Sequence, residues 1–243
     1  MLYHRKLLIS DKYYELYEYE KSLKREYTRI ERKKPKEYQQ LDLLSSYDEK
    51  HEGKQLSKRK DSIARTRSQI RRTINANPDL NKFITLTFAE NLCDVTKANR
   101  HFSKFIMRLK YIYDDFKYIS IIEFQHRGAV HYHFLCNIPY IDSSELSKLW
   151  GQGFIKINRI HHVDNLGAYV CKYLQKDMQE ARLFNRKKFF KSQNLQQSII
   201  IYDDKIIEKI IEMQGLSSVQ PVYKCEFANE WVGMVKYNQF KLE

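Results

Sequence analysis

The sequence predicts an α+β fold, a five-stranded antiparallel sheet with flanking helices. Short runs rich in β-branched and aromatic residues, typical of strands, recur through the middle of the chain. Stripes of apolar residues at helical spacing separate several of these runs. The resulting order is strand, helix, strand, strand, helix, strand, helix and strand, which favours an antiparallel sheet over a parallel one.

Each element of this core has its own signal in the sequence. The runs that predict strands are 82–88 (KFITLTF), 117–125 (KYISIIEFQ), 129–137 (AVHYHFLCN), 153–159 (GFIKINR) and 187–191 (KKFFK). The predicted helices are 95–113, 142–150, which begins with an Asp-Ser-Ser cap, and 163–179.

The flanking regions have different patterns. Residues 1–50 are rich in Tyr, Lys and Glu and show loose helical patterning. Residues 53–75 carry eight Lys or Arg against one Asp, and their isoleucines have helix-compatible spacing, which predicts a basic amphipathic helix. We therefore expect a basic helical N-terminal region (1–76), the core domain (77–195), and a C-terminal extension (196–243) with a helix at 198–214 and a hairpin of 222–227 with 231–242.

Composition indicates a nucleic-acid partner. The net charge is +13 and the sequence pI is about 9.4, and such an excess favours a polyanion. With no apolar run of about 20 residues and no signal peptide, we expect a cytoplasmic protein without membrane contact. Four cysteines form no CxxC pair, so no zinc module is expected. The candidate DNA-binding residues are Arg65, Arg67, Arg71, Arg72, Arg127, Arg182, Lys187 and Lys188.

Two histidines separated by one residue lie in the predicted strand 129–137. Side chains alternate faces along a strand, so His131 and His133 share one face, about 7 Å apart, while Tyr132 points to the other. Two imidazoles placed in this way are able to hold a divalent metal ion. The alternative for an isolated pair is a half-buried or surface histidine without any ligand.

A carboxylate on the preceding strand joins this pair if the loop between the strands has the right length. A three-residue loop at 126–128, with Gly128 in the left-handed conformation, places Glu123 opposite His131. A two-residue loop would turn Glu123 to the other face. The first arrangement gives a two-histidine, one-carboxylate site with open positions for a phosphate oxygen and water.

Two tyrosines and two lysines line one face of the predicted helix 163–179. Tyr169, Lys172, Tyr173 and Lys176 have the spacing i, i+3, i+4 and i+7. A phenolate can attack phosphorus, and an ammonium group can orient the phosphate or favour the phenolate. The alternative is ordinary core packing, since the chain holds 18 tyrosines.

Three motifs in this order resemble those of the HUH endonuclease superfamily: FITLTF (83–88), EFQHRGAVHYHFL (123–135) and AYVCKYLQK (168–176). Within it, the chain resembles the rolling-circle replication initiators of bacterial plasmids and phages. The resemblance covers residues 82–191. It implies an RRM-like five-stranded sheet, with the histidine pair on a central strand and the tyrosine helix above it.

The resemblance also implies an activity and its parts. The expected reaction is metal-dependent nicking and joining of an origin strand, through a 5′-phosphotyrosine link that leaves a free 3′-OH. Expected partners are single-stranded origin DNA, a host polymerase and, because no P-loop motif is present, a host helicase. The implied residues are His131, His133 and Glu123 as ligands of Mg²⁺ or Mn²⁺, Tyr173 as the first-choice nucleophile, Tyr169 as second nucleophile or helper, and Lys172 and Lys176 at the family's lysine positions.

Three alternatives stay open at this point. A relaxase or a single-tyrosine transposase would use the same chemistry, although relaxases typically have a third histidine where this chain offers Glu123. A non-catalytic DNA-binding regulator could share the fold. A single-stranded nucleic-acid binding module would use exposed aromatic side chains instead.

Overall fold

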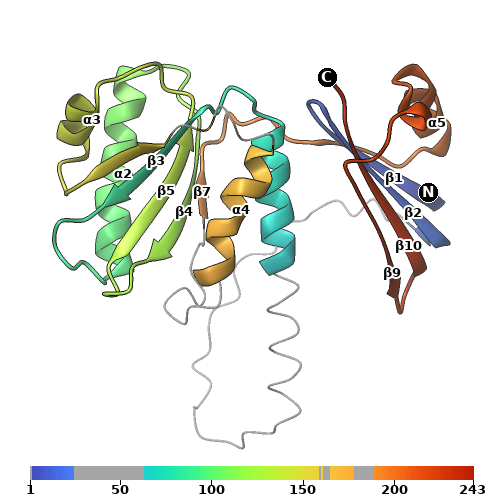
Figure 1. Cartoon of the computed structure of the whole chain (residues 1–243), viewed down its shortest axis with the longest axis horizontal. Helices are drawn as coiled ribbons and strands as arrows, with labels where there is room; N and C mark the ends of the chain where they lie inside the picture. Colours follow the sequence, from blue (N-terminus) through green and yellow to red (C-terminus); the bar gives the residue numbers. More distant parts are fainter. Residues whose placement is uncertain (1, 25–62, 159, 161–164, 178–188) are drawn as a thin grey trace, which may run out of the picture. The chain divides into compact units, whose positions relative to one another are not determined.

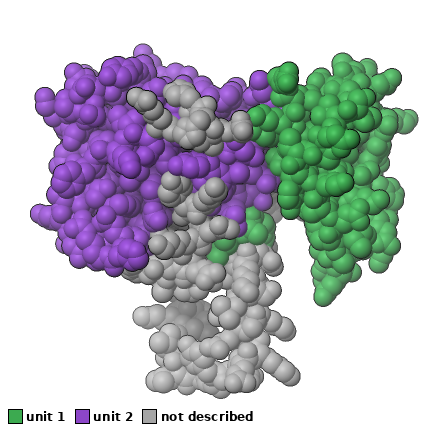
Figure 2. All heavy atoms as spheres, viewed as in Figure 1, with its two compact units in different colours: residues 1–8, 13–65, 200–243 green, residues 9–12, 66–199 purple. Residues whose placement is uncertain are grey.

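A computed structural model describes residues 2–24, 63–158, 160, 165–177 and 189–243, with the backbone alone described for 172–177. The chain divides into two compact units (Figure 2). One unit comprises residues 1–8, 13–65 and 200–243, and the other comprises residues 9–12 and 66–199. Each unit contains a five-stranded antiparallel sheet, which confirms the predicted α+β class.

The sheet of the second unit carries the candidate site. Its centre is the histidine strand β5, and every neighbouring pair of strands is antiparallel, as predicted. The strand bounds agree with the predicted runs to within two residues, apart from 187–188, which lie outside the described residues. In sheet order the strands are β6 (Ile155–Asn158), β3 (Lys82–Thr87), β5 (Val130–Cys136), β4 (Tyr118–Phe124) and β7 (Phe189–Lys191).

Helices cover both faces of this sheet (Figure 1). Helix α2 (Val95–Ile112) begins at Asp94, whose carboxylate accepts hydrogen bonds from the amides of Thr96 and Lys97. Its apolar stripe packs on one face of the sheet, in a buried cluster that includes Tyr132 and Phe134. Helix α3 (Ser143–Trp150) is capped by Asp142 and contacts α2. Because both faces are covered, β4 and β5 are apolar almost throughout.

The tyrosine helix α4 (Leu166–Asp177) packs against β4, on the face opposite α2. The Asn165 side chain accepts a hydrogen bond from the amide of Ala168 and so begins the helix. A second helix, residues 63–75, lies alongside it. A Cβ atom on Gly167 would lie 2.8 Å from the Arg71 carbonyl oxygen, and the Cys171 thiol lies 3.4 Å from the Arg67 carbonyl oxygen. The two helices therefore run antiparallel in close contact.

The first unit joins strands from both ends of the chain in one sheet. Its strands, in order, are β8 (Ile199–Ile201), β1 (Leu2–Ser10), β2 (Tyr13–Lys24), β10 (Gly233–Lys241) and β9 (Tyr223–Asn229). Helix α5 (Asp204–Met213) is tied to β1 by ion pairs of Arg5 with Asp204 and Glu208.

The prediction of a helical N-terminal region is wrong for residues 2–24 and holds for 63–75. Asp11 adopts a φ of 54° in the turn between β1 and β2, a conformation that Asp tolerates better than most residues. Alternate tyrosines of β2 pair across to β10, with Tyr17 opposite Tyr237. Pairing over such a sequence distance outweighs weak local helical patterning. For the same reason 199–201 form a strand within the predicted helix 198–214.

Replacing Gly167 with valine should loosen the contact between α4 and helix 63–75. The added atoms would meet the backbone of Arg71 and the Asn75 side chain, and overpacking of this kind costs about 1–3 kcal/mol. A fall of several degrees in Tm, measured by calorimetry, is expected. Ala168→Val, at the exposed neighbouring position, has the same β-branched cost without the clash and serves as control. Equal Tm values for the two variants would contradict the close helix contact.

Candidate active site

The loop between β4 and β5 sets the position of the candidate carboxylate. The Gly128 amide donates to the Gln125 carbonyl, the Gln125 amide donates to the Ala129 carbonyl, and Gly128 has a φ of 87°. This is a three-residue loop with its glycine in the left-handed region. In the resulting register Glu123 lies opposite His131, so the predicted arrangement of the hairpin is confirmed.

Glu123, His131 and His133 converge on one face of the sheet. One potential ligand atom from each residue lies within 4.8 Å of the others. The His133 Nε2 atom and a Glu123 carboxylate oxygen form a close hydrogen bond, and the two imidazole rings have centroids 6.4 Å apart. Two imidazoles and one carboxylate suit a divalent cation of the first transition row or Mg²⁺ when further oxygen ligands complete the shell.

The polar atoms of His131 support this interpretation. Its Nε2 atom is buried and has no hydrogen-bond partner among the described residues, which is costly unless a ligand occupies it. Burial, together with the nearby charges of His133 and Arg127, lowers the pKa of His131, while Glu123 opposes the shift. The ring is therefore neutral at physiological pH, as a metal ligand must be. The donor set thus fits a divalent metal ion.

Two residues of β3 hold the His133 ring in place. Thr85 lies opposite His133 in the sheet, and its hydroxyl oxygen is 3.3 Å from the ring Nδ1 atom. Phe83 stacks on the same ring, with centroids 5.7 Å apart and planes 8° from parallel. A partner on Nδ1 leaves Nε2 directed at Glu123, which is the usual arrangement behind a metal-binding histidine.

Helix α4 lies on the histidine face of the sheet. The Tyr169 ring meets the edge of Phe83 at a centroid distance of 5.8 Å, so one aromatic ring separates it from His133. Phe83 lies opposite Leu135 in the sheet, while Thr85 and Thr87 lie opposite His133 and His131.

The direction of α4 follows from its neighbours. Helix 63–75 ascends in Figure 1 toward the end of the sheet where β3 begins, and α4 descends beside it, in the direction of β3. Beyond Tyr169 the helix axis therefore advances from the level of Leu135 toward that of the two histidines. The side chains of Lys172, Tyr173 and Lys176 lie outside the described residues.

Tyr132, between the two histidines in sequence, serves the opposite face. It is fully buried, stacks on Phe102 and donates its hydroxyl to Asn99. Burial raises its pKa. This phenol is therefore a core residue and not a candidate nucleophile.

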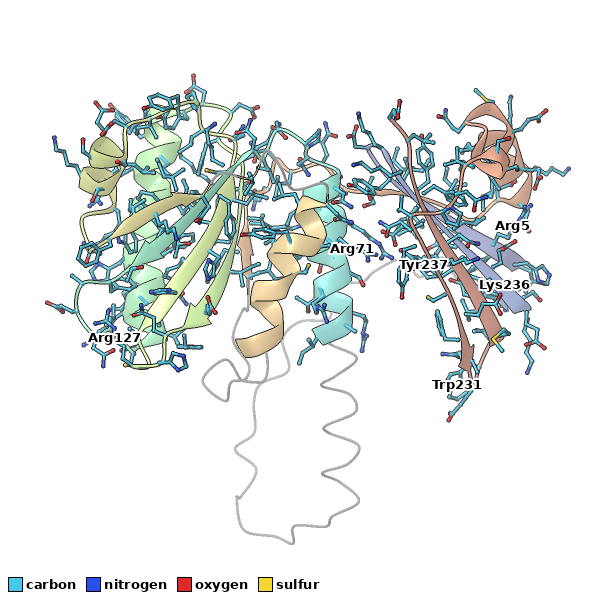
Figure 3. All side chains as sticks on the ribbon, in the orientation of Figure 1. Arg5, Arg71, Arg127, Trp231, Lys236 and Tyr237 are labelled. Atoms are coloured by element: carbon cyan, nitrogen blue, oxygen red, sulfur yellow. The ribbon has the colours of Figure 1, made fainter. Side chains whose placement is uncertain are left out.

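Arg127 lies at the end of the hairpin (Figure 3). Its guanidinium donates to the Gln125 side chain at 2.8 Å and to the Phe88 carbonyl at 2.9 Å. Gln125, considered a possible helper of Glu123, instead orients this arginine. The result is an ordered positive charge close enough to His131 to affect its pKa.

The other basic candidates divide into two groups. Arg65, Arg67, Arg71 and Arg72 lie on helix 63–75, where Arg65 is exposed and the others are partly buried. Arg182, Lys187 and Lys188 lie outside the described residues. No helix in the described part of the chain is long and apolar enough to cross a membrane.

Sequence patterns did not reveal the support that β3 gives to the site. Phe83 and Thr85 share a face with the histidines because β3 and β5 are neighbours in one particular register. Alternation within 83–88 indicated which residues share a face, but not which strand lies beside them.

Residues 81–178 match the family model of the replication-associated protein ORF2. The match covers less than half of the chain, but it includes β3, α2, the β4–β5 hairpin and α4. This part of the chain is therefore similar to a family of replication proteins, which supports a role in DNA replication and an interaction with DNA. Neither the curated proteins nor the solved structures include a significant match to the chain.

The metal site can be tested by titration. Wild-type protein should bind one Mn²⁺ per chain, and His131→Ala should weaken binding by at least about tenfold, since it removes a direct ligand. Isothermal titration calorimetry gives both values. His126→Ala, which removes an exposed histidine of the adjoining loop, is the matched control and should bind as wild type. Equal affinities for the two variants would exclude His131 as a ligand.

Proposed function

We propose that this protein initiates replication by nicking one DNA strand and later rejoining it, with a tyrosine of α4 as the nucleophile. The observation that supports this most directly is the convergence of Glu123, His131 and His133 on the sheet face that α4 covers. The similarity of residues 81–178 to a replication-associated family supports DNA as the substrate.

Mg²⁺ or Mn²⁺, held by Glu123, His131 and His133, would neutralise negative charge on the scissile phosphate. Thr85 and Phe83 keep the His133 ring in a fixed orientation, so the site loses little entropy when the phosphate arrives. Arg127 adds a fixed positive charge beside His131, which favours a phosphate over a neutral ligand at this end of the hairpin.

The proposed reaction forms one bond to phosphorus and breaks another. The phenol oxygen loses its proton and attacks the phosphate, and the 3′-oxygen of the upstream nucleotide leaves and takes up a proton. The products are a 5′-phosphotyrosine ester and a free 3′-OH that a polymerase can extend. Because the ester replaces one phosphodiester with another, the reverse attack by a 3′-OH rejoins the strand.

Tyr173 is the proposed nucleophile, and Tyr169 is a second nucleophile or a helper. The Tyr169 ring packs on Phe83 at the level of Leu135, and Tyr173 follows one helical turn later, about 6 Å along the axis. That turn carries the helix toward the level of the histidines. Lys172 and Lys176 have helical spacing that places them beside the tyrosine face, where an ammonium group would orient the phosphate.

The nuclease can be tested with single strands that tile the DNA next to the gene. Each strand is labelled at its 3′ end, incubated with protein and Mn²⁺, and resolved on a denaturing gel. The wild type should give a labelled band at the mass of the protein, because the fragment joined to tyrosine keeps the 3′ end. Tyr173→Phe should reduce this adduct by at least about a thousandfold.

Two controls make the assay decisive. Tyr111→Phe changes an exposed tyrosine of α2 and should form the adduct normally. Tyr169→Phe should retain the first adduct and lose at most the transfer to a second strand. Salt-sensitive binding of the strands without any adduct would instead identify a non-catalytic DNA-binding protein.

A further inference from the structure

The exposed side of α2 carries a row of positive charges on the face of the sheet opposite the histidines. Lys97, Arg100, His101 and Lys104 follow the spacing i, i+3, i+4 and i+7 and so line one face of the helix. The helix from Val95 to Ile112 contains no Asp or Glu. Because α2 packs on the Tyr132 side of the sheet, this row is separate from the candidate active site.

The row borders a groove of about 770 Å³ that is open to solvent. Among the described residues, the groove is lined by hydroxyl, amide and basic side chains of α2 and by one aromatic ring, and none of these lining residues is acidic. The lining residues are Thr96, Lys97, Asn99, Arg100, His101, Ser103, Lys104 and Phe190.

Two of the lining residues are held by the core beneath them. Phe190, on β7, is half-buried and packs on Phe102 with ring centroids 5.8 Å apart. Asn99 uses its carbonyl oxygen to accept the Tyr132 hydroxyl at 2.7 Å, which leaves its NH₂ group as a donor for a ligand. The groove therefore combines fixed apolar and polar contacts with mobile cations along its edge.

We propose that this groove binds single-stranded DNA. A strand needs two things from a protein, positive charges along the phosphates and an aromatic face on which a base can stack. Lys97, Arg100 and Lys104 extend over about 10 Å of helix and supply the charges, and Phe190 supplies the ring. A concave groove with an aromatic floor suits a flexible strand better than a rigid duplex.

The groove would hold a part of the DNA that the active site does not reach. Nicking produces a strand with a free end, and a second contact on the opposite face of the sheet keeps that strand near the protein after cleavage. The choice of DNA over RNA rests on the proposed function. The binding of a strand by α2 does not, and it can be measured without cleavage.

The test compares two triple variants in EDTA, where no metal-dependent cleavage occurs. One is Lys97→Ala/Arg100→Ala/Lys104→Ala in the groove. The other is Lys110→Ala/Lys148→Ala/Lys209→Ala, which removes the same charge from positions outside the groove. Fluorescence anisotropy with a labelled oligothymidine gives the affinity and its dependence on salt. Matched Tm values show that both variants are folded.

The groove variant should bind at least about tenfold more weakly, and its log–log salt slope should fall by about two, since each phosphate contact on a single strand contributes about 0.7. The control variant should change the slope little. Ultraviolet crosslinking followed by mass spectrometry should place thymine on Phe190, and Phe190→Leu should abolish that crosslink while keeping the contact with Phe102.

Three outcomes would overturn the proposal: equal losses in the two triple variants, crosslinks confined to other peptides, or tighter binding of a duplex than of the strand by the groove residues. An active wild-type nuclease whose groove variant binds DNA normally would refute the groove alone. Loss of strand binding in the groove variant of a protein that forms no adduct would support the groove and leave the nuclease refuted.

Discussion

The register of the β4–β5 hairpin is the constraint on which the candidate site depends. Side chains alternate along a strand, so a shift of one residue would move Glu123 away from both histidines. The register is set by a loop of three residues, and that loop requires a residue with φ near 87° at Gly128. A side chain at this position would be strained. One glycine at the edge of the sheet therefore determines whether three distant side chains can share a ligand.

Burial gives this arrangement its chemical properties. Helices on both faces turn β4 and β5 into apolar strands, and the polar cluster on the α4 side brings together the carboxylate, the imidazoles and their threonine partner. Low polarity around it keeps His131 neutral and strengthens electrostatic interactions with an incoming phosphate. The same covering helix, α4, carries the tyrosines. Catalytic groups and the apolar setting that they need are thus supplied by the same elements.

Much of this unit could be predicted from local sequence. Alternating strands, the cap before α2 and the Gly128 loop are local features, and each has a physical signal in a few neighbouring residues. Features that depend on distant partners were not accessible in this way. The support of His133 by Thr85 and Phe83 depends on β3 lying beside β5, and the N-terminal strands depend on β10, more than 200 residues later. The groove on α2 depends on Phe190, which a separate strand brings to the helix.

The central claim is that Glu123, His131 and His133 bind one divalent ion beneath the tyrosine helix. Its most direct test is a crystal structure of the protein grown with Mn²⁺, with anomalous data collected at the manganese edge. The account predicts one strong anomalous peak at about 2.0–2.3 Å from a carboxylate oxygen of Glu123 and from one ring nitrogen of each histidine. Well-ordered side chains with no peak between them, or a peak at a different set of ligands, would contradict it.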